Sequence, residues 1–154
     1  MVMNLLRWLA APEPAVLPQD EARMALAALM VRLARSDGDY SAAEVARIER
    51  VLARRFGLDA AGAADLRTGA EALEAGAPDT VRFTRALKAA VPLEDRIGLV
   101  EALWSVALAD GGRDAEEDRL MRLVVSLLGV TDPESGLARQ RAARASGRGG
   151  PSVA

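Results

Sequence analysis

Apolar residues recur every three or four positions along most of the chain, which is the period of an α-helix with one buried face. Leu26, Met30 and Leu33 form one such stripe, and residues 99–106 repeat its spacing. No segment alternates apolar and polar residues for long, so the pattern predicts an all-α fold, a single-domain bundle of about seven helices. Caps and breakers place these helices near residues 19–36, 42–55, 60–75, 80–90, 92–110, 115–128 and 133–145.

One stretch occurs twice without a gap. Residues 34–44 (ARSDGDYSAAE) and 107–117 (ALADGGRDAEE) align at an offset of 73, with Ala, Asp, Gly and Glu in register. In both copies a helical pattern runs into Asp-Gly, and a new one starts just before the Glu. The sequence therefore predicts an internal two-fold repeat of a helix–corner–helix unit.

Four carboxylates continue the apolar faces at these two corners. Asp37 and Asp110 extend the stripes that precede the corners, and Glu44 and Glu117 begin the stripes that follow. Carboxylates that face a core need protons, hydrogen-bond donors or a cation. If the repeat brings the corners together, carboxylates about 6 Å apart repel by about 3 kcal/mol at an effective dielectric of about 20. A divalent cation would convert this repulsion into binding, so these four residues are the candidate metal ligands.

A structural interpretation of the same residues stays open. Ser41-x-x-Glu44 has the spacing of a capping box, and Asp114-x-x-Glu117 has it in a looser form. In this interpretation both glutamates bind backbone N–H groups at a helix start, and each Asp-Gly pair is ordinary turn chemistry. The spacing also differs from that of an EF-hand loop.

Composition limits the chemistry. The 154 residues include no Cys and no His, which removes disulfides, thiol and histidine catalysis and the usual zinc ligands. A bound metal would therefore be Ca²⁺, Mg²⁺ or Mn²⁺. The net charge of −2, with both signs mixed, gives no indication of nucleic-acid binding. No nucleophile–base pair, phosphate loop or nucleotide fingerprint is present, so we expect neither an enzyme nor an organic cofactor.

The two ends of the chain differ from its middle. Residues 1–9 can form a short amphipathic helix, followed by a Pro-rich linker up to residue 18. This helix is either a peripheral membrane contact or a segment that docks on the protein's own core or frays. The helical domain then covers residues 19–145, and residues 146–154 are rich in Gly, Ser and Pro, so we expect a disordered tail. No apolar run approaches the roughly 20 residues of a spanning helix, and no signal peptide is recognisable, so we expect a cytoplasmic protein.

An ordered series of blocks over about residues 20–145 resembles the tellurite-resistance TerB-like family. The resemblance implies an all-helical bundle in which Asp37, Glu44, Asp110 and Glu117 are the family's acidic, metal-binding cluster. It also implies a role in resistance to tellurite and other stresses, at the cytoplasmic face of the membrane, with a membrane protein as partner. One departure is Gly112, which replaces the Asp39 of the first copy. The blocks are Asp37-Gly38-x5-Glu44, Phe56-Gly57-Leu58, Arg82-Phe83-Thr84-Arg85-x-Leu87, Leu103-Trp104-x-Val106-Ala107-x-Ala109-Asp110-Gly111-x5-Glu117 and Leu127-Leu128-Gly129-Val130.

Two functional hypotheses follow. The first is a non-enzymatic, cation-binding interaction module of the tellurite or general stress response. The second is a metal-free helical adaptor whose carboxylates are helix caps and salt-bridge partners. A similar domain in a membrane-anchored J-domain co-chaperone implies that such a module can serve as an adaptor.

Overall fold

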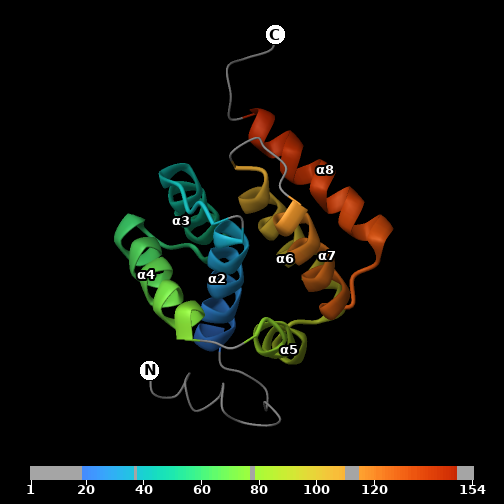
Figure 1. The fold of residues 1–154 in the computed structure, drawn as a ribbon, viewed down its shortest axis with the longest axis horizontal. Helices are drawn as coiled ribbons and strands as arrows, with labels where there is room; N and C mark the ends of the chain where they lie inside the picture. Colours follow the sequence, from blue (N-terminus) through green and yellow to red (C-terminus); the bar gives the residue numbers. More distant parts are fainter. Residues whose placement is uncertain (1–18, 37, 77–78, 110–114, 149–154) are drawn as a thin grey trace.

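The computed structural model describes residues 19–36, 38–76, 79–109 and 115–148 (Figure 1). These residues form helices and connecting turns without any strand, which confirms the predicted all-α bundle. The predicted amphipathic helix over residues 1–9 and its linker lie outside the described residues. The helices are α2 (Gln19–Arg35), α3 (Ala42–Phe56), α4 (Ala60–Gly76), α5 (Val81–Ala90), α6 (Leu93–Ala107), α7 (Ala115–Leu127) and α8 (Asp132–Arg148).

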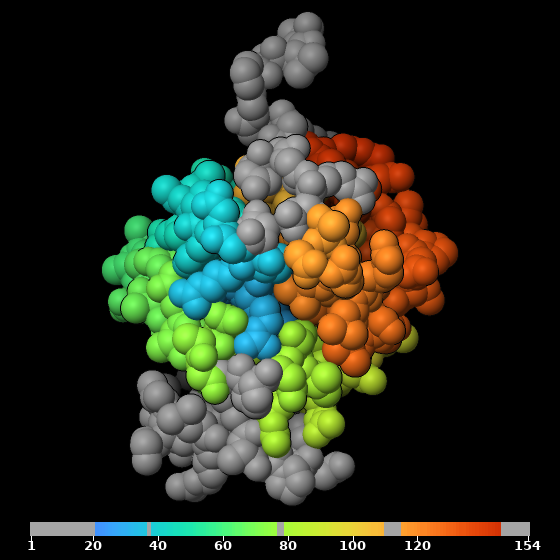
Figure 2. Space-filling model, viewed as in Figure 1, coloured from blue at the N-terminus to red at the C-terminus, as the bar shows by residue number. Residues whose placement is uncertain are grey.

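Helix α2 lies at the centre of the bundle. Its residues 25–31 are all buried, although the sequence pattern predicted only one inward stripe. A helix that is apolar on all sides can be surrounded by other helices, and α2 contacts α3, α4, α5, α6 and α7. Ala25, Ala27 and Ala28 are fully buried, and their small side chains let neighbouring helices approach closely. Figure 2 shows α2 reaching the surface between α3, α4, α5 and α7.

Helix α6 packs most extensively against α8. Its stripe Leu99, Leu103 and Val106 is buried, as the spacing predicted. The Nε1 of Trp104 donates a hydrogen bond to the Ser135 hydroxyl of α8 at 3.0 Å. This bond satisfies the polar end of a half-buried indole, so Trp104 fixes α8 on α6.

Two helices end differently from the prediction. Helix α6 ends at Ala107, three residues before the predicted Asp110. Helix α8 runs from Asp132 to Arg148 and so extends into the predicted disordered tail, following a stretch rich in Ala and Arg, which favour helices. Its start carries a capping box that the prediction missed, because Thr131 N donates to Glu134 Oε1 at 2.9 Å and Glu134 N to Thr131 Oγ1 at 3.3 Å.

The predicted internal repeat pairs α2 and α3 with α6 and α7. The starts at Gln19 and Leu93, Ala42 and Ala115, and Ala60 and Asp132 are separated by 74, 73 and 72 residues. The two most extensive helix contacts, α2 with α4 and α6 with α8, also correspond. Yet the contact between α3 and α4 is more extensive than that between α7 and α8. The spacing of the helices agrees with the offset of the two corners, while the internal repeat and its two-fold symmetry in space stay a prediction.

Candidate metal centre at the two acidic corners

The first corner joins α2 to α3. Gly38 has φ 83°, a left-handed conformation that residues with a Cβ rarely adopt, and its N–H donates to the Arg35 carbonyl at 2.9 Å. This bond closes the turn after α2 and lets the chain reverse direction before Ser41, the N-cap of α3. Asp37 lies outside the described residues.

Glu44 lies in the first turn of α3 and is 1% exposed. The structure confirms the predicted capping box, in which Ser41 N donates to Glu44 Oε1 at 2.9 Å and Glu44 N donates to Ser41 Oγ at 3.1 Å. The cap therefore engages one of the two carboxylate oxygens. Its side chain begins the buried stripe that continues with Ile48 and Leu52, so it points toward the core as predicted.

The second corner joins α6 to α7. Residues 110–114, which include the candidate ligand Asp110 and the looser capping residue Asp114, lie outside the described residues. Glu117, in the first turn of α7, is 5% exposed and begins the stripe that continues with the buried Met121 and Val124. Thus both predicted glutamates occupy the same inward-facing position of corresponding helices.

Glu44 and Glu117 stand apart from all other charged residues that the structure describes. They alone among these have buried side chains. Their neighbours Asp39 and Glu116 are exposed, and Glu116 forms an ion pair with Arg119 one turn further along α7. Two carboxylates at equivalent corners are therefore the charges that the fold withdraws from water.

The structure does not test whether the four candidate ligands converge. Within residues 19–36, 38–76, 79–109 and 115–148 no three or more acidic, Cys or His side chains form a group that could hold a metal ion. Glu44 and Glu117 begin helices on either side of α2, which contacts both α3 and α7 (Figure 1). The predicted four-carboxylate site thus depends on Asp37 and Asp110, and it stays a prediction.

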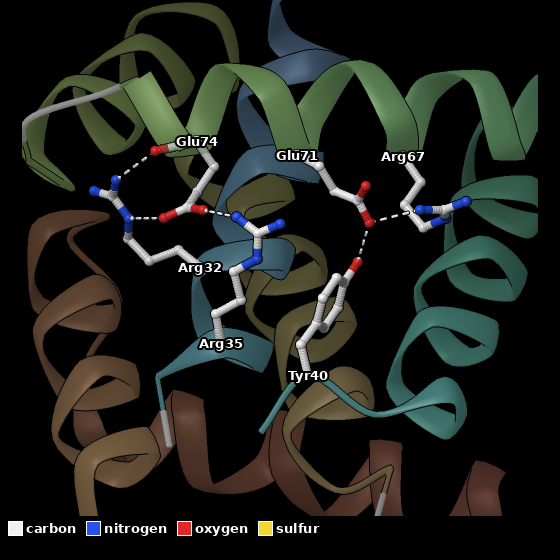
Figure 3. Close-up of polar contacts among 6 residues, drawn as sticks. All are labelled: Arg32, Arg35, Tyr40, Arg67, Glu71 and Glu74. Atoms are coloured by element: carbon white, nitrogen blue, oxygen red, sulfur yellow. Dashed lines mark hydrogen bonds and ion pairs between the residues drawn. The ribbon is translucent and has the colours of Figure 1, made fainter. Parts of the chain in front are cut away.

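A polar network anchors the first corner to α4 (Figure 3). Tyr40, the chain's one tyrosine, donates from its hydroxyl to Glu71 Oε2 at 2.7 Å. Arg67 binds the same carboxylate and, through Nε, Glu49 Oε2 of α3 at 2.7 Å. Because α3, α4 and the corner meet in these bonds, the network fixes the segment that precedes the Ser41 cap.

The network shifts the pKa values of its members. Burial and the hydrogen bond to Glu71 raise the pKa of Tyr40 to about 12. Burial acts to raise the pKa of Glu71, but the hydrogen bonds from Tyr40 and Arg67 and the charge of Arg67 outweigh it, so this pKa lies below its usual value. The bond to Glu49 raises the pKa of Arg67. Glu71 is therefore held as an anion and Tyr40 as a neutral phenol.

Two arginines of α2 hold the last turn of α4, next to this network. Arg32 Nε lies 3.0 Å from Glu74 Oε2 and its Nη2 donates to the Glu74 carbonyl at 3.1 Å, while Arg35 Nη1 lies 2.8 Å from Glu74 Oε1 (Figure 3). Arg35 also stacks over the Tyr40 ring, 5.2 Å from its centroid. The last turn of α2 is thus bound both to α4 and to the corner.

Sequence comparison assigns the family. The model of the family described as "Tellurite resistance protein TerB" matches residues 23–140, most of the chain. The chain belongs to the TerB family. No curated protein and no solved structure matches it. Among the described residues, no TerB-domain helix is long and apolar enough to cross a bilayer.

The network around Tyr40 and the arginines of α2 was missed by the sequence analysis. Tyr40 and Glu71 are 31 residues apart, and Arg32 and Glu74 are 42 apart, so no local spacing relates them. One signal was available: the single tyrosine stands inside the corner, directly before the capping Ser41.

Proposed function

We propose that this TerB domain is a non-enzymatic interaction module of tellurite or general stress resistance that binds a divalent cation at its acidic corners. Asp37, Glu44, Asp110 and Glu117 would supply the ligands, and Ca²⁺, Mg²⁺ or Mn²⁺ would be the ion, since these prefer oxygen. The module would act at the cytoplasmic side of the membrane on a protein partner, which the family suggests is a membrane protein.

One observation supports the cation most directly. Glu44 and Glu117 are buried to 1% and 5% exposure at equivalent positions of α3 and α7. An ionised carboxylate in the interior is unfavourable unless hydrogen bonds or an opposite charge compensate it. A divalent ion shared by the two corners would add an opposite charge for both glutamates and for the Asp of each Asp-Gly pair, beside the interactions that both glutamates already form within the protein.

The capping box at Glu44 favours a second candidate, the metal-free adaptor. Ser41 and Glu44 satisfy each other's backbone N–H groups, which is a complete structural role for Glu44. An ionised carboxylate offers about four lone-pair sites on two oxygens, however, so a cap at one oxygen is compatible with an ion at the other. The two candidate functions therefore differ in whether the domain binds a divalent ion, and a titration with metal ions distinguishes them.

The test is a calorimetric titration of the chelator-treated full chain with Ca²⁺, Mg²⁺ and Mn²⁺. We expect saturable binding of at least one ion that is lost in the Asp37→Asn/Asp110→Asn and Glu44→Gln/Glu117→Gln double variants. Asp65→Asn, which removes an exposed carboxylate of α4, is the matched control and should bind as the wild type does. If the wild type binds no ion at millimolar concentration, the cation proposal fails and the adaptor takes its place.

The membrane part of the proposal concerns residues 1–9, which lie outside the described residues. Their apolar face would make a peripheral contact with the inner leaflet near the membrane-protein partner. Sedimentation of the full chain and of a chain lacking residues 1–18 with anionic vesicles tests this. Equal binding by the two chains would exclude the contact.

A further inference from the structure

A hollow of about 350 Å³ opens where α2 and the end of α3 meet the junction of α5 and α6. Its volume lies within the range of pockets that take small organic ligands. Neither Glu44 nor Glu117, the two described candidate ligands, lines it. Its apolar wall is formed by Leu26, Phe56, Leu87, Val91 and Leu99.

Arg23 of α2 brings a buried hydrogen-bond donor to this hollow. Its guanidinium stacks over the Phe56 ring, 5.0 Å from the centroid. Its Nε is buried and has no hydrogen-bond partner among the described residues. A buried N–H without an acceptor is unfavourable, and most such groups in native proteins bind protein, water or a ligand.

Arg55 of α3 is a second guanidinium with donors to spare. Within the described residues it forms no ion pair, and its one hydrogen bond, from Nη1 to the Gly98 carbonyl, is long at 3.4 Å. Burial lowers the pKa of Arg55, although the charges of Asp95 and Glu101 act to raise it. Part of the side chain remains open to solvent. Water therefore reaches the guanidinium, few of its N–H groups are taken up by protein acceptors, and an anion can reach it as well.

Gly98 lets the Arg55 guanidinium lie close against the backbone of α6. It lies inside α6, where glycine is less favourable than alanine, and a Cβ at this position would lie 3.3 Å from Arg55 Nη2 and 3.4 Å from Nη1. Arg55 and Gly98 also line a second hollow of about 300 Å³ beside the first. The Arg55 guanidinium thus lies over Gly98, and both residues border the two hollows.

The charged residues that line the hollow limit which ligands it can bind. Glu94 and Asp95 line the same hollow as the two arginines, so its charges balance, and a multiply charged anion such as phosphate would gain no net attraction to offset the loss of its hydration. We propose that the hollow binds a small organic monocarboxylate. The carboxylate would accept hydrogen bonds from Arg23 and Arg55, and the apolar body would pack against Phe56 and Leu99.

The test is an NMR titration of the ¹⁵N-labelled full chain with hexanoate, with hexanol, which has the same body without the charge, and with inorganic phosphate. We expect saturable shifts at Gly98 with hexanoate, binding of hexanol at least about tenfold weaker, and no saturable shift with phosphate. Equal binding of hexanol and hexanoate, saturable binding of phosphate at Gly98, or no saturation by hexanoate would overturn the proposal.

Two variants test whether Arg23 and Arg55 donate the hydrogen bonds to the carboxylate. Arg55→Met and Arg23→Met keep most of the side-chain stem and should each weaken hexanoate binding about tenfold or more. Arg50→Met removes an exposed arginine of the same helix that lines neither hollow and should leave binding unchanged. The spectrum of each variant shows whether it is folded. If the Arg55 and Arg50 variants bind hexanoate equally, Arg55 does not hold the carboxylate.

Discussion

The cation proposal predicts how stability depends on the ion in three chains that differ only around Glu44. Wild type, Ser41→Ala and Glu44→Gln are each unfolded by heat in chelator and again at an ion concentration of about 100 times the dissociation constant. A ligand that binds only the folded state then adds about 2.7 kcal/mol. For a domain of this length that gain corresponds to a rise in Tm of about 5–10 °C.

Ser41→Ala separates the cap from the ion. It removes the hydroxyl that accepts from Glu44 N at 3.1 Å, so we expect a loss of about 1 kcal/mol in chelator. The Glu44 charge remains, so the gain from the ion should match that of the wild type. Glu44→Gln keeps an oxygen that can accept from Ser41 N but loses the charge, so its gain from the ion should fall to a small fraction.

Each gain is measured within one variant, so differences in baseline stability cancel. Differential scanning calorimetry supplies both Tm and enthalpy, and Asp65→Asn controls for the general loss of a negative charge. If Glu44→Gln gains as much as the wild type, Glu44 is not a ligand. If only Ser41→Ala loses the gain, the cap rather than the carboxylate controls the ion.

Three further predictions concern the supports of the corner and the core. The pKa of Tyr40 is raised to about 12, so its contribution to stability is complete below the ordinary value near 10 and is lost as the pH rises toward 12. In urea unfolding at pH 9 to 11, Tyr40→Phe should therefore lose less stability with rising pH than the wild type. An equal pH dependence in both chains would contradict this. Glu74→Gln weakens the bonds of Arg32 and Arg35, and should cost about 2 kcal/mol in urea unfolding, whereas a cost near zero would show that the clamp is unimportant. Ala28→Leu adds volume at a fully buried position of α2 and should cost about 1–3 kcal/mol, and an unchanged Tm would indicate space beside α2.

Local patterns predicted much of this fold. The spacing of Leu26, Met30 and Leu33 placed the buried face of α2, and the helix predicted near residues 42–55 is α3, which ends at Phe56 before Gly57, whose φ is 64°. The same stripe argument placed Glu44 and Glu117 on inward faces, where the structure buries them. These features depend on a few neighbouring residues, so the sequence alone contains them.

Other features depend on contacts between distant segments. The stripe in α2 did not predict that residues 25–31 are buried on every side, because this follows from how many helices surround α2. The hollow at Arg55 is formed by α2, α3, α5 and α6 together, and no residue spacing in the sequence predicts it. By contrast, the cap Thr131-x-x-Glu134 was visible in the sequence, and its omission placed the start of α8 at Pro133 instead of Asp132.

X-ray diffraction can show directly whether one divalent ion joins the two acidic corners. Crystals of the full chain grown with Mn²⁺ and measured at an energy where manganese scatters anomalously would locate the ion directly. We expect an anomalous peak within bonding distance of carboxylate oxygens from both corners, Glu44 and Glu117 among them. A peak elsewhere, or none at saturating Mn²⁺, would contradict the cation proposal.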